Sequence, residues 1–429
     1  MHFVKRNSWK ISAVAPTWRF NLSEVVNPSK YLGRELEYLT KVLEAESWSA
    51  TGGSWTRELE MQYARLMNSK YAVAMNSGTA TLHSALEAVG VGAGDEVISP
   101  ALTVVMDTTA TLHANAIPVY ADIDAKTFNI DVEDVRRKIT NRTKAIIAVA
   151  LYGLPCDLEP LRSLADEAGV ALIEDNAQCV LAEYQGQYVG NWGDVASWSF
   201  ENTKHLSAGE GGMVTTNSAQ LAEKMRKIGG HGFKNLGPED GRVRLNQDVF
   251  QDPDYKRHDS LGWNYRMPEF IAAVALAQLE RAEELIKLRQ DSAQIFLDVV
   301  EKCSFLTPQF VPSDRSHTYY TLGLLYDETE AGGVSWQDFR KMYMANGGDG
   351  IYGAWSVPYL EPVISSGTFK ERAPGIYGSV SYAPGLCPVA EYIQPRLMQF
   401  KTNYRDIHVA QQKALILDQT IAEISQRNS

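Results

Sequence analysis

Short apolar segments with the length of β-strands alternate with helical patterns between residues 71 and 217 of this 429-residue chain. Apolar residues at three- and four-residue spacing mark the helical patterns, as in residues 158–169. Strands that alternate with helices form a mostly parallel sheet with helices on both faces. The sequence therefore predicts an α/β domain. The predicted strands are 71–75, 95–100, 116–123, 144–151, 170–175, 195–200 and 211–217.

Further helical patterns flank this block. Residues 34–46 and 55–67 precede it, and a long helical pattern over 267–303 leads out of it. The remainder combines a predicted strand at 318–326 with a C-terminal helix at 409–424, as expected of a smaller α+β domain. The polar stretch 233–260 has no clear period and is predicted to be a long loop. We therefore divide the chain into an N-terminal segment (1–44), a large domain (45–285) and a small C-terminal domain (286–429).

Charge and cysteine content exclude several classes of protein. The 41 basic and 52 acidic side chains are interspersed and give a formal net charge of −11, which argues against a nucleic-acid partner. Four cysteines without a CxxC pair indicate reduced thiols in a cytoplasmic protein. Residues 1–20 lack the apolar segment of a signal peptide, and no stretch approaches the roughly 18 apolar residues of a membrane span. We expect no membrane partner and no metal site.

Two motifs follow predicted strands. In Asn76–Ala80, Gly78 permits a close backbone approach, and the following helix presents free N–H groups to an anion. An ordinary strand-to-helix turn with a Ser or Thr cap explains the same residues. In 173–178, Glu174 and Asp175 lie at the carboxyl edge of a buried strand, where open α/β sheets bind ligands. Because side chains alternate along a strand, only one of these two acids can face a ligand. A pair of solvated loop acids is the alternative.

The third motif is a lysine near a strand end. Lys204 follows the predicted strand 195–200, and the glycine-rich segment 207–212 returns the chain to the next strand. This arrangement suits a lysine that forms a Schiff base with a bulky cofactor, since glycines permit tight turns beside it. A surface lysine next to a glycine-rich loop is the alternative interpretation.

Taken together and in this order, the three motifs resemble the DegT/DnrJ/EryC1/StrS family of sugar aminotransferases, which depend on pyridoxal 5'-phosphate (PLP). The likeness runs from about Tyr31 to the C-terminus and includes the segments LIEDNAQ, GDVASWSFENTKHLSAGEGGMVTTN and GWNYRMPEFIAAVALAQLE. It implies the aspartate aminotransferase (type I) PLP fold, with a mostly parallel seven-stranded sheet in the large domain. It also implies PLP as the cofactor and a homodimer with shared active sites.

The resemblance assigns roles residue by residue. Lys204 matches the lysine that forms the Schiff base, and Asp175, rather than Glu174, matches the aspartate that pairs with the pyridine nitrogen. Asn264 matches an asparagine that reaches the phosphate from the neighbouring subunit. The other cofactor-binding positions that it implies are Gln178 beside the ring and Gly78, Thr79 and Ser199 at the phosphate.

Two positions bear on the reaction. Dehydratases of the family carry histidine in place of the lysine, so Lys204 favours transamination. Val104 stands where the family usually has Phe or Trp, which reduces the flat surface available to the cofactor ring. His205, His231, His317 and Arg266 are weaker candidates, with structural roles as the alternative.

The resemblance implies transfer of an amino group from L-glutamate to a keto-sugar, nucleotide-linked, for a surface polysaccharide or natural product. An L-glutamine-dependent ketocyclitol (inosose-type) aminotransferase is the alternative, and Glu201 does not separate the two. A non-catalytic regulator with the PLP fold is a third hypothesis, against which Lys204, Asp175 and Gln178 argue together. A Rossmann dehydrogenase is excluded, because no GxGxxG follows an early strand.

Overall fold

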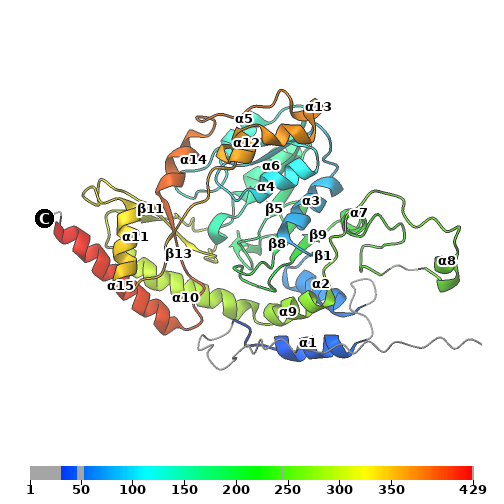
Figure 1. The fold of residues 1–429 in the computed structure, drawn as a ribbon, viewed down its shortest axis with the longest axis horizontal. Helices are drawn as coiled ribbons and strands as arrows, with labels where there is room; N and C mark the ends of the chain where they lie inside the picture. The colour runs from blue at the N-terminus through cyan, green and yellow to red at the C-terminus, as the bar shows by residue number, and fades with distance from the viewer. Residues whose placement is uncertain (1–29, 46–52, 243–244, 428–429) are drawn as a thin grey trace, which may run out of the picture.

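A seven-stranded sheet lies at the centre of the large domain (Figure 1). The structure is a computed structural model, and it describes residues 30–45, 53–242 and 245–427. The strand order is β1-β9-β8-β5-β4-β2-β3, and among these strands β9 alone runs antiparallel to its neighbours. All seven predicted strands are present and the mostly parallel sheet is confirmed. The strands are β1 (Tyr71–Met75), β2 (Glu96–Pro100), β3 (Ile117–Ala121), β4 (Thr143–Val149), β5 (Ala171–Asp175), β8 (Val195–Ser199) and β9 (Gly212–Thr216).

Helices cover both faces of this sheet, because alternate strand residues are apolar on both sides. In β1, Val73 and Met75 join the core under one helical layer, while Ala72 and Ala74 join the core under the other. The first layer consists of α3 (Gly78–Ala88), α4 (Met106–His113) and α7 (Ala219–Gly229). The second consists of α1 (Glu35–Glu44), α2 (Trp55–Leu66), α5 (Val132–Lys138), α6 (Leu158–Ala168) and α9 (Glu269–Leu279).

The long helical pattern predicted over 267–303 forms two helices instead of one. The break falls at Glu280 and Arg281, between α9 and α10 (Ala282–Val300). The helix α9 packs against α1 and α2, whereas α10 packs against α15 (Ile407–Arg427). Each part therefore buries its apolar side chains against a different neighbour. The predicted domain boundary at residue 285 lies inside α10.

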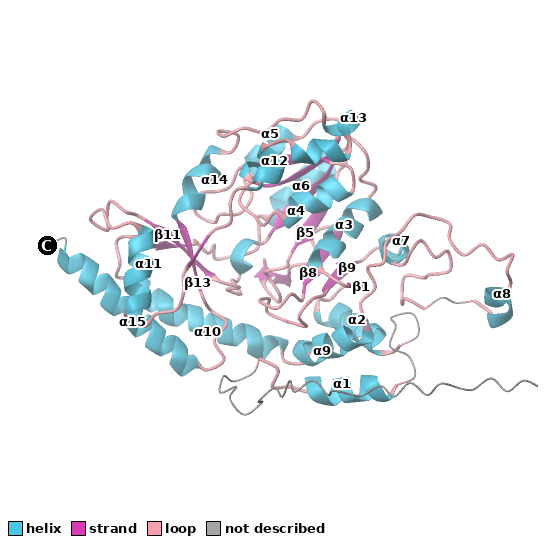
Figure 2. Cartoon of the chain, viewed as in Figure 1, coloured by secondary structure: helices cyan, strands magenta, loops and turns pink. Residues whose placement is uncertain are grey.

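A smaller antiparallel sheet carries the C-terminal core (Figure 2). Its strand order is β10-β11-β13-β12, and α10, α11 (Trp336–Ala345) and α15 pack against it. The predicted strand at 318–326 is confirmed in its second half, and the predicted C-terminal helix is longer than expected. The remaining strands are β10 (Leu306–Pro308), β11 (Leu322–Tyr326), β12 (Tyr352–Gly353), β13 (Leu397–Phe400) and a separate hairpin of β6 (Glu183–Tyr184) and β7 (Gln187–Tyr188).

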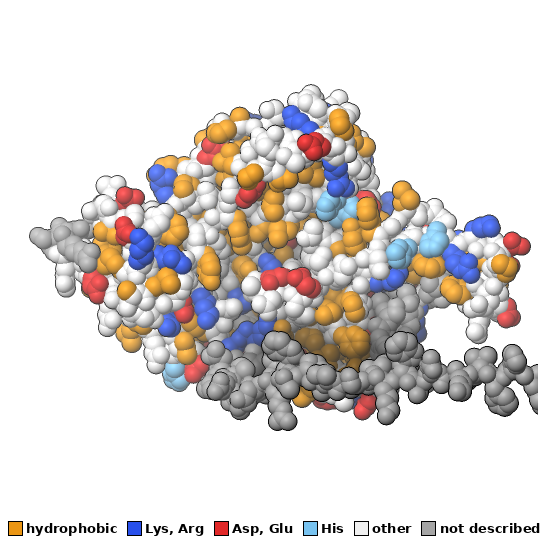
Figure 3. Space-filling model, in the orientation of Figure 1, with side chains coloured by type: hydrophobic (Ala, Val, Ile, Leu, Met, Phe, Trp, Pro, Cys, Tyr) orange, Lys and Arg blue, Asp and Glu red, His pale blue; other side chains and the backbone are white. Residues whose placement is uncertain are grey.

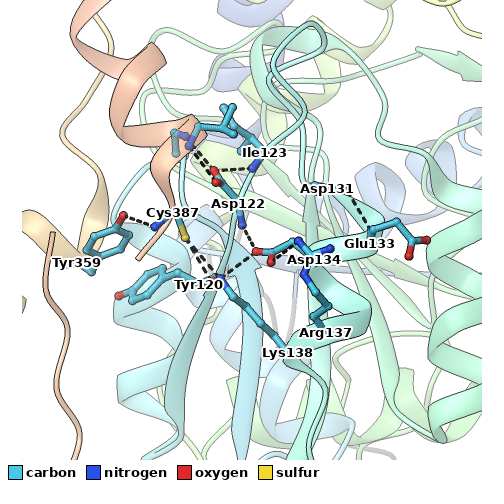
Figure 4. A network of polar contacts seen from close by, with 12 residues as sticks. Tyr120, Asp122, Ile123, Asp131, Glu133, Asp134, Arg137, Lys138, Tyr359 and Cys387 are labelled. Carbon is cyan, nitrogen blue, oxygen red and sulfur yellow. Dashed lines mark hydrogen bonds and ion pairs between the residues drawn. The ribbon is translucent and has the colours of Figure 1, made fainter. Parts of the chain in front are cut away.

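Residues 357–393 lie in the C-terminal part of the sequence but pack on the edge strand β3 of the large sheet. Figure 4 shows the polar contacts that hold them. The Asp122 carboxylate accepts hydrogen bonds from the N–H groups of Val389 (2.9 Å) and Ala390 (2.8 Å), where a helix begins and a negative charge is favourable. The segment therefore covers an edge strand that would otherwise be exposed. Its elements are η3 (Pro358–Leu360), α12 (Pro362–Ser365), η4 (Thr368–Arg372), α13 (Pro374–Tyr377) and α14 (Pro388–Ile393).

The polar stretch 233–260 is mostly loop, as predicted, and contains one short helix, α8 (Gln247–Gln251). In Figure 1 this stretch extends away from the sheet. Two further turns of 3-10 helix are η2 (Leu151–Gly153) and η5 (Gln394–Arg396).

On the face drawn in Figure 3, acidic and basic side chains are interspersed. None of the helices in the described ranges is long and apolar enough to cross a membrane. The prediction for residues 1–20 lies outside the described residues.

Candidate active site

A cavity of about 510 Å³ lies at the carboxyl ends of β1, β2, β5 and β8. This is the edge at which open α/β sheets bind ligands, and the volume is in the range of small-molecule sites. The structure brings five of the seven predicted cofactor-binding residues to its lining. These five are Gly78, Thr79, Asp175, Ser199 and Lys204.

The N-terminus of α3 forms one end of the cavity. Ser77 caps the helix, since its Oγ accepts the N–H of Ala80 at 3.1 Å. A Cβ atom on Gly78 would lie 2.9 Å from the Cβ of Ser199, so no side chain fits between the two segments. The first N–H groups of a helix have no partner within it and attract anions. This end therefore suits a phosphate, and the cap that we named as the alternative is present in the same turn.

Glu174 and Asp175 point to opposite sides of β5, as the strand alternation predicts. The Glu174 carboxylate is buried beneath residues 190–193 and accepts the N–H groups of Gly190 (2.7 Å), Trp192 (2.9 Å) and Gly193 (2.7 Å). Asp175 instead lines the cavity, where its Oδ1 accepts the N–H of Ala177 at 3.0 Å. Glu174 thus holds a loop, and Asp175 is the acid available to a ligand.

Burial raises the pKa of Asp175 above its usual range. The N–H of Ala177 and the positive charge of Lys204 both act in the opposite direction and favour the carboxylate. The effect of burial is the larger one, so the pKa of Asp175 is raised as long as no cation lies close to its carboxylate. A cationic ligand atom beside Asp175 would therefore be stabilised by this carboxylate in a poorly solvated place.

The segment that carries Lys204 is fixed by hydrogen bonds to its backbone. Arg289 of α10 donates from one terminal nitrogen to the carbonyl oxygens of Thr203 (2.8 Å) and Lys204 (3.1 Å). Its other terminal nitrogen donates to the carbonyl of Tyr320 at 2.6 Å. Lys30 holds the preceding turn through the carbonyl of Asn202, at 2.6 Å. The Lys204 Nζ lies 4.6 Å from the centroid of the Tyr320 ring, inside the cavity.

Two predicted residues do not line this cavity. Gln178 is buried near Asp175, and its side-chain oxygen accepts the N–H of Tyr152 at 2.8 Å. Asn264 is exposed, and its carbonyl accepts the side chain of Asn76 at 3.2 Å. Gln178 therefore holds the backbone of Tyr152, and Asn264 lies outside the cavity lining of its own chain.

The chain matches a known protein family over most of its length. Residues 31–388 match the DegT/DnrJ/EryC1/StrS aminotransferase family. The chain belongs to this family. It is a PLP-dependent aminotransferase, and the type I fold is confirmed.

Individual relatives are similar over most of the chain. A GDP-perosamine synthase of Escherichia coli O157:H7 is 35% identical over 68% of this chain and 75% of its own length. An L-glutamine:2-deoxy-scyllo-inosose aminotransferase of Streptomyces kanamyceticus is 31% identical over 89% of this chain and 91% of its own. An aminotransferase from Psychrobacter cryohalolentis has a crystal structure that superposes with a TM-score of 0.79, at 29% identity, and covers 91% of this chain and 97% of its own.

The residues of the aminotransferase cavity fit PLP in charge and space. A phosphate is accommodated where Gly78 leaves no room for a side chain, at the start of a helix. A pyridinium nitrogen is accommodated by the buried carboxyl of Asp175. The Lys204 amine lies within the same cavity.

In the described part of the chain, no cluster of His, Cys, Asp and Glu side chains could hold a metal ion.

The weaker candidates for site residues, His205, His231, His317 and Arg266, lie outside the cavity lining. His317 is buried with both ring nitrogens hydrogen-bonded, one of them to the N–H of Tyr319, and burial lowers its pKa to about 3. His205 is buried and its Nε2 is hydrogen-bonded to the carbonyl oxygen of Thr318 at 2.9 Å, while His231 is exposed. Arg266 lines a separate small cavity beneath the loop that follows α7. None of the four residues therefore lines the cavity, and their positions fit the structural roles that are the alternative interpretation.

Sequence reasoning missed Arg289 and Tyr320. Tyr320 and Trp355 are the aromatic side chains of the cavity lining. Arg289 is buried, and in the described ranges its hydrogen bonds go to carbonyl and hydroxyl oxygens rather than to carboxylates. An arginine on a helix gives no sign in the sequence that it will contact a lysine loop 85 residues earlier.

Proposed function

We propose that this aminotransferase moves an amino group from L-glutamate to the ketone of a nucleotide-linked keto-sugar. The observation that carries the proposal is the convergence of Lys204, Asp175 and Gly78 on one cavity. The similarity to a GDP-perosamine synthase supports the nucleotide-linked acceptor. The amino sugar would enter a surface polysaccharide or a natural product.

Each group has a distinct part in this proposal. PLP, when bound, supplies an electron sink for the carbanion that forms at the substrate carbon. Asp175 holds a proton at the ring nitrogen through its negative charge. The Lys204 amine would remove a proton from the substrate carbon as a general base and deliver it, as a general acid, to the cofactor carbon that bears the nitrogen. Gly78, Thr79 and Ser199 would hold the phosphate of the cofactor and so keep it in place beside Lys204.

Three glutamates of the cavity lining support an acceptor rich in hydroxyl groups. These are Glu201, Glu210 and Glu361, and carboxylates accept hydrogen bonds from hydroxyl groups. One carboxylate oxygen of Glu201 already accepts the N–H of Thr203 at 2.9 Å and its hydroxyl at 2.6 Å. The second Glu201 oxygen and the other two glutamates are therefore the groups that we assign to acceptor hydroxyls.

A ketocyclitol acceptor with L-glutamine as the amino donor is the second candidate. The inosose aminotransferase of Streptomyces kanamyceticus supports it, because the similarity extends over 89% of this chain. The glutamates of the lining suit a cyclitol as well as a sugar. A non-catalytic regulator has less support, since the proposed lysine and aspartate line one cavity.

We further propose that the enzyme is a cytoplasmic homodimer with shared active sites. Asn264 is exposed and lies outside the cavity of its own chain, so a role at the phosphate requires a second subunit. Sedimentation equilibrium tests the dimer, and a mixed dimer tests the sharing. A mixed dimer combines one wild-type subunit with one subunit that carries both Asn264→Ala and Lys204→Ala. If the sites are shared, the site that keeps Lys204 lacks Asn264, so the dimer has one impaired site and one inactive site. If each site lies within one chain, the site of the wild-type subunit is unimpaired.

The visible absorption of the PLP-loaded protein tests the proposed reaction. Addition of L-glutamate should bleach the absorption band of bound PLP, and 2-oxoglutarate should restore it. GDP-perosamine should also bleach the band, since transamination is reversible. Bleaching by L-glutamine, with restoration by 2-deoxy-scyllo-inosose, would support the cyclitol candidate instead. Lys204→Ala is the control. A band that no donor alters would contradict transamination, and absence of PLP binding would refute the whole proposal.

A further inference from the structure

A second buried carboxyl group lies behind Asp175. Asp107, in the first turn of α4, is 0% exposed and does not line the cavity. Its Oδ2 accepts the hydroxyl of Thr103 at 2.7 Å. Its Oδ1 is buried, and no N–H group or hydroxyl group in the described ranges donates a hydrogen bond to it. The side chains of Asp107 and Asp175 nevertheless lie in hydrogen-bonding contact.

Two carboxyl groups can form a hydrogen bond only if one of them carries a proton. Burial and the negative charge of Asp175 raise the pKa of Asp107 well above its usual range, and these effects outweigh the hydrogen bond from Thr103. Asp175 has more support for its anion, from the N–H of Ala177 and the charge of Lys204. The proton of the pair therefore resides on Asp107. Its Oδ1 is the oxygen available to carry this proton, because Oδ2 accepts the hydroxyl of Thr103.

We propose that Asp107 is a positioning residue that donates a hydrogen bond from its neutral carboxyl to Asp175 and fixes the carboxylate facing the PLP ring nitrogen. This inference rests on the proposed role of Asp175. A carboxylate that accepts a hydrogen bond is less basic, so the proton shared with the ring stays on nitrogen. Loss of the donor would leave Asp175 free to rotate and more basic. The ring nitrogen would then lose part of its positive charge.

Three variants separate this role from a merely structural one. Asp107→Asn is neutral, keeps an N–H donor for Asp175 and keeps an oxygen for Thr103. Asp107→Leu has a similar volume and no donor. Thr108→Val is the matched control, because Thr108 is also buried on α4 but is hydrogen-bonded to the Tyr120 hydroxyl at 3.1 Å. Each protein is loaded with PLP labelled with ¹⁵N in the ring, and the ring-nitrogen chemical shift reports its protonation.

We expect a protonated ring nitrogen in the wild type, Asp107→Asn and Thr108→Val, and a shift toward the unprotonated position in Asp107→Leu. The rate of the L-glutamate half-reaction should fall roughly 10- to 100-fold in Asp107→Leu, as for loss of a hydrogen bond to a charged group. It should change less than about 3-fold in Asp107→Asn, within the range of a neutral replacement that keeps the bond.

A wild-type ring signal and rate in Asp107→Leu would overturn the proposal. An equal loss in Asp107→Asn and Asp107→Leu would also overturn it, because a neutral donor would then not suffice. If Asp107→Leu does not fold, Asp107→Asn still decides, since replacement of an ionised Asp107 would alter the ring signal. Failure of the wild type to bind PLP would instead refute the proposed function, and an unprotonated ring in the wild type would refute the role of Asp175.

Discussion

The adjacent acids Glu174 and Asp175 should respond in opposite ways to replacement by their amides. Both are buried, with 0% and 3% of their surface exposed, but they lie on opposite faces of β5. One Glu174 oxygen accepts the N–H groups of Trp192 and Gly193, and the other accepts the N–H of Gly190 and the side-chain amide of Asn176. Glu174→Gln therefore tests stability, and Asp175→Asn tests catalysis.

The contacts set the size of each effect. In Glu174→Gln, the amide oxygen can still accept two N–H groups, but the new NH₂ group faces the buried N–H of Gly190. The side chain of Asn176 can turn its amide oxygen toward the new NH₂ group and so keep a hydrogen bond. Loss of one hydrogen bond to a charged group, together with an unsatisfied buried donor, amounts to about 3 kcal/mol of unfolding free energy. In Asp175→Asn the sign is reversed. Burial raises the pKa of Asp175, so its carboxylate disfavours folding of the PLP-free protein at neutral pH, and the variant should be at least as stable.

Catalysis should show the opposite order. Removal of the charge at Asp175 should lower the rate of the L-glutamate half-reaction roughly 10²- to 10³-fold, as for loss of a preorganised electrostatic partner. Glu174→Gln should change that rate less than about 5-fold wherever the protein is folded. Urea unfolding of the PLP-free proteins at matched concentration gives the first quantity, and stopped-flow absorbance of the loaded proteins gives the second. A slow but stable Glu174→Gln, or an Asp175→Asn of undiminished rate, would refute the assignment of faces.

Three further predictions follow from the same structure. Gly78→Ala should weaken PLP binding roughly 10-fold or more in a fluorescence titration, because the new Cβ would lie 2.9 Å from a neighbouring side-chain carbon; Gly92→Ala, with open space around its Cβ, is the control. Arg289→Met should slow the L-glutamate half-reaction roughly 10- to 100-fold with PLP still bound, since the backbone of Lys204 loses a donor; an unchanged rate would contradict this. His317 stays neutral in the folded protein until about pH 3, so stability falls as pH drops from about 6.5. His317→Asn should therefore lose about 2 kcal/mol less than the wild type between pH 7 and pH 5 in urea unfolding.

The sequence predicted the large sheet well, because its signals are local. Each of the seven strands is a short apolar run bounded by glycine, proline or polar residues, and helical patterns separate most of them. The motifs follow strand ends, so parallel topology alone brings Gly78, Asp175 and Lys204 to one edge. The prediction of one long helix at 267–303 was wrong, because apolar spacing continues across Glu280 although the packing partner changes there.

The parts of the site that the sequence did not reveal depend on long-range packing. Asp107 stands in a segment that reads as an ordinary helix start, and its burial beside Asp175 follows only from the neighbouring strands. Residues 357–393 belong to the C-terminal part of the sequence, yet they cover β3 through contacts such as Asp122 with Val389. Such pairings join residues more than 60 positions apart, which no local pattern records.

Arg289 connects the lysine segment with the aromatic wall of the cavity. It donates to the carbonyls of Thr203, Lys204 and Tyr320, and the Tyr320 hydroxyl is in turn hydrogen-bonded to Thr203 at 2.7 Å. A buried guanidinium that is bonded to three carbonyls cannot release one of them without leaving polar groups unsatisfied. The lysine segment and Tyr320 should therefore move together whenever the C-terminal region shifts. The position of the Lys204 amine is then set by contacts with the C-terminal region as much as by β8, and the sequence around the lysine gives no sign of these contacts.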